Sequence, residues 1–178
     1  MDSFWVKLDT SESKKFVLDS PSIWENSIKQ FNMDCKLVQP FSGIITVTLQ
    51  ENGCMVDGSI SGKIVMPCNR CTTDVLITIQ HTFRDVEPLP TLNIDGKEVI
   101  NKDINENIIR QSNGIIEVNL AEILWEEFVL SLPSKPLCNI DCNGLCYSCG
   151  KDLNKETCNC SKDEGDPRLA AFKNIVIK

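Results

Sequence analysis

The 178-residue chain has a single histidine, His81, and no long apolar run. A membrane-spanning helix needs ~18 or more consecutive apolar residues, and no stretch of this chain approaches that length. The N-terminus, MDSFWVKLDTSESKK, lacks the basic and apolar regions of a signal peptide, and it is too acidic and too poor in arginine for a transit sequence. We therefore expect a cytoplasmic protein.

Motifs of known catalytic machinery are also missing. The chain has no HExxH motif, no Ser/His/Asp order of a hydrolase and no glycine-rich dinucleotide turn. GSISGK at 58–63 is not a phosphate loop, because its glycines are one residue too close and Ile64 replaces the magnesium-binding hydroxyl. His81 continues the alternation of a predicted strand, which favours a structural role. We expect no enzymatic activity; the rival, a redox or metal enzyme, needs an exposed low-pKa thiol or an open zinc position.

The charge balance of the chain is acidic. The net charge is −7, and most of the excess lies in residues 84–127, which carry 10 acidic and 4 basic side chains. Phosphate backbones repel such a chain unless a local basic face compensates. The charge therefore favours a basic protein partner over broad nucleic-acid binding.

Cysteine, by contrast, is abundant. Eight of the ten cysteines fall into clusters, a C-x2-C pair far upstream and six in the run CNIDCNGLCYSCGKDLNKETCNC. In a reducing cytosol clustered thiols bind metal more often than they form disulfides, and a C-x2-C turn presents two thiolates to one zinc ion. We predict about two structural zinc ions, held by Cys68, Cys71, Cys138, Cys142, Cys146, Cys149, Cys158 and Cys160. The other two, Cys35 and Cys54, are predicted to be buried thiols.

Two groupings of the eight ligands satisfy these spacings. In the first, the last four cysteines share one metal, with Gly150 at positive φ in the Cys146–Gly150 knuckle, and the first two of the run join the upstream pair. In the second, the first four cysteines of the run share one metal and the last two join the upstream pair. All-cysteine sites close the coordination shell, so either grouping predicts a structural role.

Periodicity predicts an α+β fold, a curved antiparallel β-sheet with flanking helices and a C-terminal cysteine-rich zinc-binding segment. Alternating apolar residues predict strands in 45–49, 56–66 and 75–83, with a hairpin turn at Asn52-Gly53 and the upstream C-x2-C at the tip of the next hairpin. Shorter strands are expected at 5–8 and 115–118. Interior glycines predict that the sheet bends.

Two helices flank the predicted sheet. The first lies within 19–33, with Ser22 and Glu25 at capping-box spacing and with Trp24 and Phe31 in the core. The second starts from a cap at Asn119, and three of its glutamates are expected to face outward: Glu122, Glu126 and Glu127. We predict a core at 1–132 with a mobile acidic excursion at about 84–113. Residues 133–178 form the cysteine-rich module and a terminal helix that starts at Asp166.

Four motifs occur in a fixed order along the chain: PCNRC, IIEVNLAEILWEEFVLSLPSKPLC, CNGLCYSCGKDLN with the following CNC, and DPRLAAFKNI. Together they resemble the bacterial YceD family, whose members are called large ribosomal RNA subunit accumulation proteins. The resemblance covers roughly Gly58 to the C-terminus. Residues 1–50 match the family only in general character.

The resemblance implies a role in ribosome biogenesis, supporting accumulation or processing of large-subunit ribosomal RNA, with no known enzymatic activity. The implied partner is the pre-large-subunit particle, contacted through ribosomal RNA or a basic ribosomal protein. Arg70 matches the central arginine of the family's upstream cysteine pair, and the six clustered cysteines match its cysteine-rich branch. Some relatives lack that cluster. The alternative is a zinc-ribbon nucleic-acid-binding regulator, which needs a basic face near Lys135, Lys151, Lys155 and Lys162.

Overall fold

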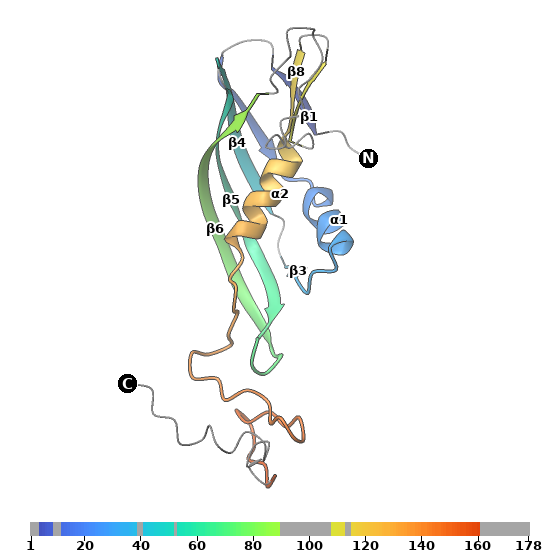
Figure 1. Ribbon diagram of the computed structural model, residues 1–178. Coiled ribbons are helices and arrows are strands. Elements are labelled where there is room, and N and C mark those ends of the chain that lie inside the picture. The colour runs from blue at the N-terminus through green and yellow to red at the C-terminus, as the bar shows by residue number, and fades with distance from the viewer. Residues whose placement is uncertain are drawn as a thin grey trace, which may run out of the picture.

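The computed structural model describes residues 4–8, 12–38, 41–51, 53–89, 108–112 and 115–160. Within these ranges the chain forms two antiparallel sheets and two α-helices, followed by the cysteine-rich segment (Figure 1). This arrangement is consistent with the predicted α+β class. Neither helix in the described ranges is long and apolar enough to cross a membrane. The predicted terminal helix from Asp166 lies outside the described residues.

The larger sheet is built around one long hairpin. β5 (Gly53–Pro67) and β6 (Asp74–Pro88) pair in register over their whole lengths, and β4 (Ser42–Gln50) pairs with the first half of β5. Two short strands complete the sheet: β2 (Lys14–Leu18) pairs with β4, and β3 (Lys36–Leu37) pairs with the distal part of β5. Both predicted hairpins are confirmed, so the upstream cysteine pair lies at a hairpin tip.

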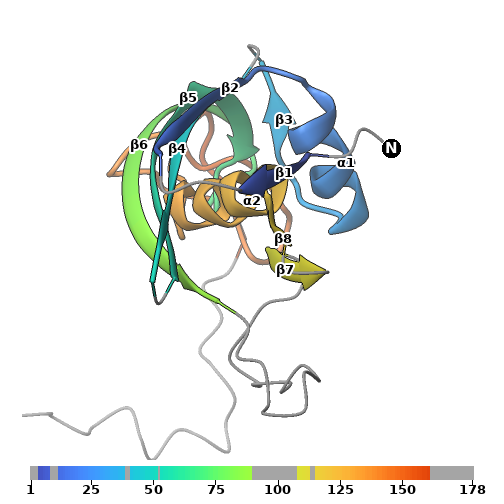
Figure 2. The ribbon, with the colours of Figure 1, turned by 90° about the horizontal axis from the view of Figure 1, so that it is seen from above.

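The sheet is strongly curved, as predicted, and wraps around one helix when seen from above (Figure 2). Gly58 of β5 is a point of close contact on the concave side, because the Phe83 ring of β6 lies directly over its Cα. A Cβ atom at this position would overlap the Phe83 ring and lie 2.7 Å from the Ile44 carbonyl oxygen of β4. The ring therefore packs across the ladder only because residue 58 has no side chain.

The substitution Gly58→Ala is expected to lower the free energy of unfolding by ~1–3 kcal/mol, the range for overpacking in a closed core. The Ile44 oxygen is backbone, so the new methyl group cannot be accommodated by moving the Phe83 ring alone. Urea unfolding followed by tryptophan fluorescence measures the change. Ser59→Ala, on the opposite face of the same strand, is the control and should shift the value by less than ~0.5 kcal/mol. Equal stability of both variants would contradict the packing argument.

The smaller sheet has the order β1 (Trp5–Leu8), β8 (Ile115–Asn119) and β7 (Ile109–Ser112). β1 and β8 were predicted, although not their pairing. The boundaries of the predicted acidic excursion at 84–113 are wrong at both ends. β6 continues to Pro88, which pairs with Gly53 of β5. At the C-terminal end of the predicted excursion, residues 109–112 form β7. Residues 90–107 lie outside the described ranges.

Both predicted helices are present: α1 (Ser22–Gln30) and α2 (Leu120–Ser131). Their predicted side-chain caps are wrong. Ser22 is the first helical residue of α1 rather than its cap, and Asn119 makes no capping bond with its side chain. The start of α2 is instead held by backbone bonds, since Leu120 N donates to the Phe4 carbonyl at 3.1 Å. Strand pairing in the smaller sheet thus replaces a local cap.

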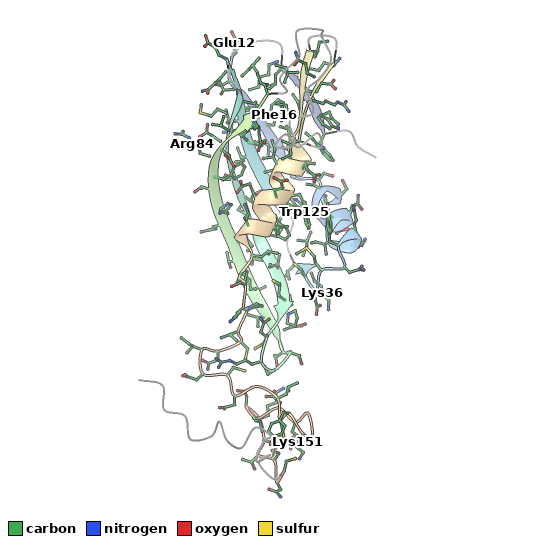
Figure 3. All side chains as sticks on the ribbon, viewed as in Figure 1. Glu12, Phe16, Lys36, Arg84, Trp125 and Lys151 are labelled. Atoms are coloured by element: carbon green, nitrogen blue, oxygen red, sulfur yellow. The ribbon has the colours of Figure 1, made fainter. Side chains whose placement is uncertain are left out.

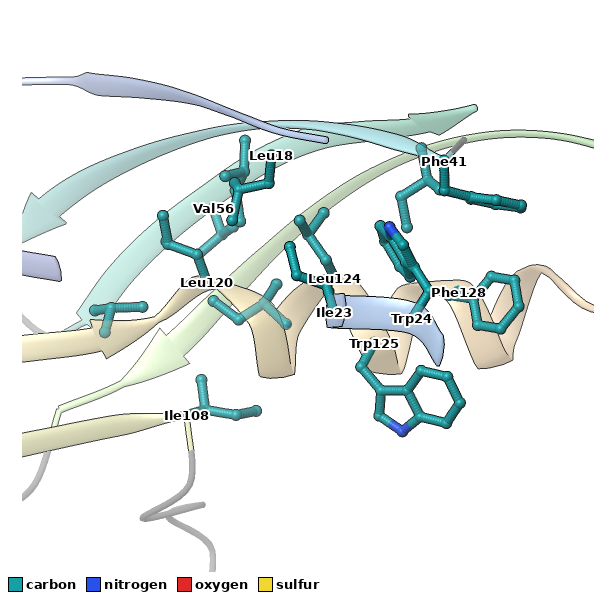
Figure 4. Packing of buried hydrophobic residues seen from close by; sticks show 14 of the residues in the cluster. Leu18, Ile23, Trp24, Phe41, Val56, Ile108, Leu120, Leu124, Trp125 and Phe128 are labelled. Carbon is teal, nitrogen blue, oxygen red and sulfur yellow. The ribbon is translucent and has the colours of Figure 1, made fainter. Parts of the chain in front are cut away.

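The core lies between the concave face of the larger sheet and the two helices (Figures 2 and 4). Trp24 of α1, Phe41 and Phe128 of α2 are fully buried and pack edge-on or tilted, with ring centroids 5.3–5.6 Å apart. The core prediction for Phe31 is wrong, because its side chain is 59% exposed. It stacks on the outer side of the buried Trp125, with centroids 5.7 Å apart.

One of the three glutamates expected to face outward points inward instead. Glu127 of α2 is 9% exposed, and its Oε2 lies 2.7 Å from Nε2 of His81 on β6. A buried carboxylate needs such a partner, because an unpaired charge in the core is strongly unfavourable. The predicted structural role of His81 is consistent with this contact, which fixes α2 against β6.

Acidic side chains gather where the end of β6 meets α2. Burial raises the pKa of Glu87, and the carboxylates of Asp85, Glu126 and Glu127 raise it further. The folded state then binds the Glu87 proton more tightly than the unfolded chain does. Stability therefore falls as the pH rises above the ordinary pKa of 4.5 and through the raised folded-state value.

The substitution Glu87→Gln is expected to raise the free energy of unfolding at pH 7 by ~0.2–1 kcal/mol, since it removes a charge that is partly buried and repelled by its neighbours. The gain should disappear below pH ~4, where Glu87 is protonated in both states. Urea unfolding at the two pH values measures the difference. Asp74→Asn, at the exposed other end of β6, serves as the control. An equal gain at both pH values would show that the gain does not come from the charge.

Candidate metal centres

Four cysteines meet at the tip of the β5–β6 hairpin. Two lie in the turn between the strands, and two come from the segment that follows α2. The backbone of that segment is bonded to the turn, since Asn69 N donates to the Pro136 carbonyl at 2.9 Å. We call this set the hairpin group; it consists of Cys68, Cys71, Cys138 and Cys142.

The remaining four clustered cysteines form a second set close to the first. We call it the tail group; it consists of Cys146, Cys149, Cys158 and Cys160. Gly150 closes its knuckle with φ +73°, as predicted, and Gly150 N donates to the Cys146 carbonyl at 2.8 Å. The structure thus brings the eight cysteines together in the first of the two groupings that the spacing allowed.

The sulfur separations suit a tetrahedral metal ion. Within each group all sulfur atoms lie within 4.8 Å of one another. Cys71 Sγ and Cys138 Sγ are 3.4 Å apart, and Cys68 Sγ and Cys142 Sγ are 3.9 Å apart. Tetrahedral coordination at a Zn–S distance of ~2.3 Å requires sulfur separations of ~3.8 Å. All ten cysteines are free thiols. Each group of four could therefore bind one metal ion.

The hairpin group contains both a low and a high thiol pKa. Burial raises the pKa of Cys68, but backbone N–H groups of Cys138, Arg70 and Cys71 donate to its sulfur and bring the pKa down to about 6. Hydrogen bonding to the Cys71 thiol, then to Cys142, raises the pKa of Cys138 to about 12. Four sulfurs so close together cannot all become thiolates unless a cation shares their charge.

The tail group has the same pattern. Backbone N–H groups of Cys149 and Ser148 donate to Cys146 and lower its pKa to about 6. Hydrogen bonding to the Cys149 thiol, followed by burial, raises the pKa of Cys160 to about 12. Preformed N–H donors and four thiols around one point make an arrangement that could hold a metal ion. With all four positions supplied by protein, it is of the closed, structural type.

Cys35 and Cys54 take no part in either group. Both are buried among the core residues, as predicted. Burial raises the pKa of each to about 11, with the neighbouring carboxylates Asp34 and Glu87 as the second cause. These thiols therefore stay protonated and apolar, which suits the interior of the fold.

Two residues that support the groups have contacts the sequence did not predict. Arg70, between the two hairpin cysteines, donates from Nη1 to the Cys142 carbonyl at 2.9 Å and to the Ile140 carbonyl at 3.3 Å. Asn154, in the loop of the tail group, donates from Nδ2 to Cys142 Sγ at 3.4 Å. The sequence marks Arg70 only as part of the PCNRC motif. Nothing in the local sequence around Asn154 indicates that it reaches the other group.

Comparison with known proteins assigns the chain to a family. The model of the YceD family, described as "Large ribosomal RNA subunit accumulation protein YceD", matches residues 56–176. The chain belongs to the YceD family. The match includes the β5–β6 hairpin, α2 and both cysteine groups.

Individual relatives are more distant. An uncharacterized protein of Mycobacterium tuberculosis (strain H37Rv) is 27% identical over 126 residues, which make up 71% of this chain and 57% of that protein. The uncharacterized protein YlbN of Bacillus subtilis is 24% identical over 155 residues, 85% of this chain and 83% of YlbN. The chain thus spans little more than half the length of the mycobacterial relatives.

A plant relative carries a functional name. The "Large ribosomal RNA subunit accumulation protein YCED homolog 1, chloroplastic" of Arabidopsis thaliana is 23% identical over 155 residues, 76% of this chain and 48% of that protein. No solved structure matches the chain. Family membership and the name of this relative suggest a ribosome-related role.

Proposed function

We propose that this chain is a non-enzymatic, cytoplasmic factor in ribosome biogenesis that supports accumulation or processing of large-subunit ribosomal RNA. The observation that carries the proposal is the family match over residues 56–176, joined by the name of the Arabidopsis relative. The cysteine groups support a structural rather than a catalytic use of metal, because protein sulfur fills all four positions of each.

Zinc is the ion that we assign to both groups. Thiolate ligands in a set of four select zinc or iron–sulfur chemistry, and knuckles of the Cys146–Gly150 kind with backbone N–H donors to sulfur are typical of structural zinc sites. The first ion is held by the hairpin group and the second by the tail group. Each ion supplies charge neutralisation and a rigid cross-link, and the residues around it supply the geometry.

A protein contact fits the charges of the chain better than an RNA contact. The net charge is −7. The alternative function, a zinc-ribbon regulator that binds nucleic acid, needs unpaired lysines on the cysteine-rich segment. Lys151 Nζ is 3.1 Å from Glu156, and Lys155 Nζ is 3.2 Å from Asp152. Of the four lysines that the alternative needs (135, 151, 155 and 162), Lys151 and Lys155 are thus paired with carboxylates. This pairing favours a basic ribosomal protein of the pre-large-subunit particle as the partner.

Depletion of the protein in its own host tests the function. We expect the ratio of large-subunit to small-subunit ribosomal RNA to fall, and to recover when the full chain is expressed from a second copy. Ribosomal RNA quantified on a gel or by sequencing measures the ratio. The control is depletion of an unrelated protein that slows growth equally. A ratio that stays unchanged under depletion would contradict the proposal.

The nature of the partner is tested by affinity capture from lysate with and without ribonuclease. Capture of ribosomal proteins that survives ribonuclease supports direct protein contact. Capture that is lost with ribonuclease and falls steeply with salt supports the nucleic-acid alternative, since phosphate contacts release counterions. A variant with Lys135→Glu separates the cases further, because only the alternative predicts a large loss from it.

A further inference from the structure

The two cysteine groups are interlocked rather than merely adjacent. Residues beside the tail-group cysteines donate hydrogen bonds both to a sulfur atom of the hairpin group and to the backbone of the hairpin turn. Backbone bonds also tie the tail-group loop to the residues that connect the two groups, since Leu153 N donates to the Gly144 carbonyl at 2.9 Å and Leu145 pairs with Asp152 in an isolated bridge. Figure 3 places Lys151, in the tail-group loop, at the opposite end of the molecule from Glu12. The interlock therefore lies at the cysteine-rich end of the molecule.

Asn154 makes the contact from the tail group to the hairpin group. Its Nδ2 donates to Cys142 Sγ at 3.4 Å, and its Oδ1 accepts from Asn143 N at 2.8 Å. Asp152 fixes the Asn154 side chain, since its Oδ1 accepts from Nδ2 at 2.7 Å and from the Asn154 backbone at 3.0 Å. These bonds hold a donor of the tail-group loop against a sulfur atom of the hairpin group.

Arg70 makes the reciprocal contact from the hairpin group to the tail group. Its carbonyl accepts from Leu145 N at 3.0 Å, directly before Cys146 of the tail group. Gly144, with φ +74°, lies so close that a Cβ atom would be 3.0 Å from the same carbonyl. The start of the tail-group knuckle is therefore built on the hairpin turn.

We infer that the two groups load metal as a coupled pair, with Asn154 as the positioning residue that transmits the coupling. With a metal ion bound by its four cysteines, the tail group would fix the Cys149–Cys158 loop, and this loop would hold the Asn154 amide against Cys142 Sγ. Four thiolates around one divalent ion carry excess negative charge, and N–H donors to sulfur stabilise it. The hairpin group then binds its ion more tightly, and by linkage an ion in the hairpin group strengthens the tail group by the same factor.

The inference rests on the proposed metal binding, and a zinc titration separates the two. The full chain is stripped of metal under reducing conditions, zinc chloride is added stepwise, and native mass spectrometry counts the ions per chain. When one equivalent of zinc has been added, coupled loading predicts that most chains carry either no zinc ion or two. Independent sites give about half or more of the chains with a single ion at that point. That result overturns the coupling and leaves metal binding intact, whereas chains that bind no zinc overturn both.

The Asn154 variants test the residue itself. Asn154→Asp keeps the size of the side chain but removes the Nδ2 donor, and Asn154→Ala removes both the Nδ2 donor and the Oδ1 acceptor. Either change is expected to let the one-zinc species accumulate and to weaken the hairpin group ~10-fold or more, the effect typical of partners that orient metal ligands. Lys151→Ala is the matched control, because it lies in the same loop and its side chain pairs with exposed Glu156. Variants that load like the unmodified chain overturn the assignment.

A second measurement distinguishes loss of coupling from misfolding of the variant. In a Cys158→Ser background the tail group is broken, so the hairpin group should bind zinc ~10-fold more weakly against a competing chelator. In this background Asn154→Ala should weaken zinc binding by the hairpin group little further, because the broken tail group no longer holds Asn154 in place. Full additivity of the two changes would show that Asn154 acts without the tail group and would overturn the coupling. Circular dichroism of the α+β core, which contains none of the eight cysteines, verifies that each variant is folded.

Discussion

Replacing Cys71 with serine is expected to lower the zinc content from about two ions per chain to one or fewer and to release the cysteine-rich segment from the hairpin tip. Apart from hydrogen bonds to the hairpin turn, the described part of the segment has only a small buried cluster to hold it. Its own buried cluster contains three cysteines with Val75 and Leu137 packed against them. Structural zinc in small modules supplies apparent binding free energies of ~10–16 kcal/mol, so losing the ion removes most of what orders the segment.

Limited proteolysis of the Cys71→Ser chain measures the release, with cleavage expected within residues 134–160. Cys35→Ala is the matched control, because Cys35 is a buried thiol outside both groups and its replacement should leave the zinc content unchanged. The thermal transition of the main fold should persist in both variants, since the core cluster contains none of the eight ligands. A Cys71→Ser chain that keeps both ions and resists the protease would contradict the proposed site.

Replacing Phe128 with alanine is expected to lower the free energy of unfolding by ~3–5 kcal/mol, the largest change we expect from any single apolar truncation. Phe128 is fully buried, and its ring is 5.6 Å from Trp24 and 5.3 Å from Phe41 (Figure 4). These rings come from α1, α2 and the segment before β4, so the cavity would open where three parts of the fold meet. The sheet backbone limits how far that cavity can collapse.

The matched control for Phe128 is on the same helix. Leu130 is 74% exposed, and Leu130→Ala should change the free energy of unfolding by less than ~0.5 kcal/mol. Urea unfolding followed by tryptophan fluorescence compares the two variants with the unmodified chain. Similar losses for Phe128→Ala and Leu130→Ala would mean that the helix is not packed on the sheet as described.

Features with a local physical cause could be predicted from the sequence. The alternation in β4, β5 and β6 follows from one buried face, and the C-x2-C turn at the hairpin tip follows from Pro67 and the spacing of the cysteines. The positive φ of Gly150 follows from the knuckle. Both helices were predicted from apolar periodicity. In each case a few neighbouring residues determine the structure.

Features that depend on distant partners could not be predicted. Glu127 of α2 is inside because His81 lies opposite it on β6, and Phe31 is outside because Trp125 already fills the position beneath it. β2 (KKFVL) and β7 (IRQS) show no clear apolar alternation, and they exist as strands because β4 and β8 pair with them. Of the two cysteine groupings that spacing allowed, the three-dimensional path of the segment after α2 selects one.

The central claim is that the eight clustered cysteines form two closed metal sites that fix the C-terminal segment to the hairpin. Elemental analysis of the freshly isolated full chain, with the protein quantified by amino-acid analysis, tests it most directly. The account predicts about two zinc ions per chain, held until a strong chelator is added. A freshly isolated chain that carries no zinc, with all eight thiols free to react with a thiol reagent, would contradict it.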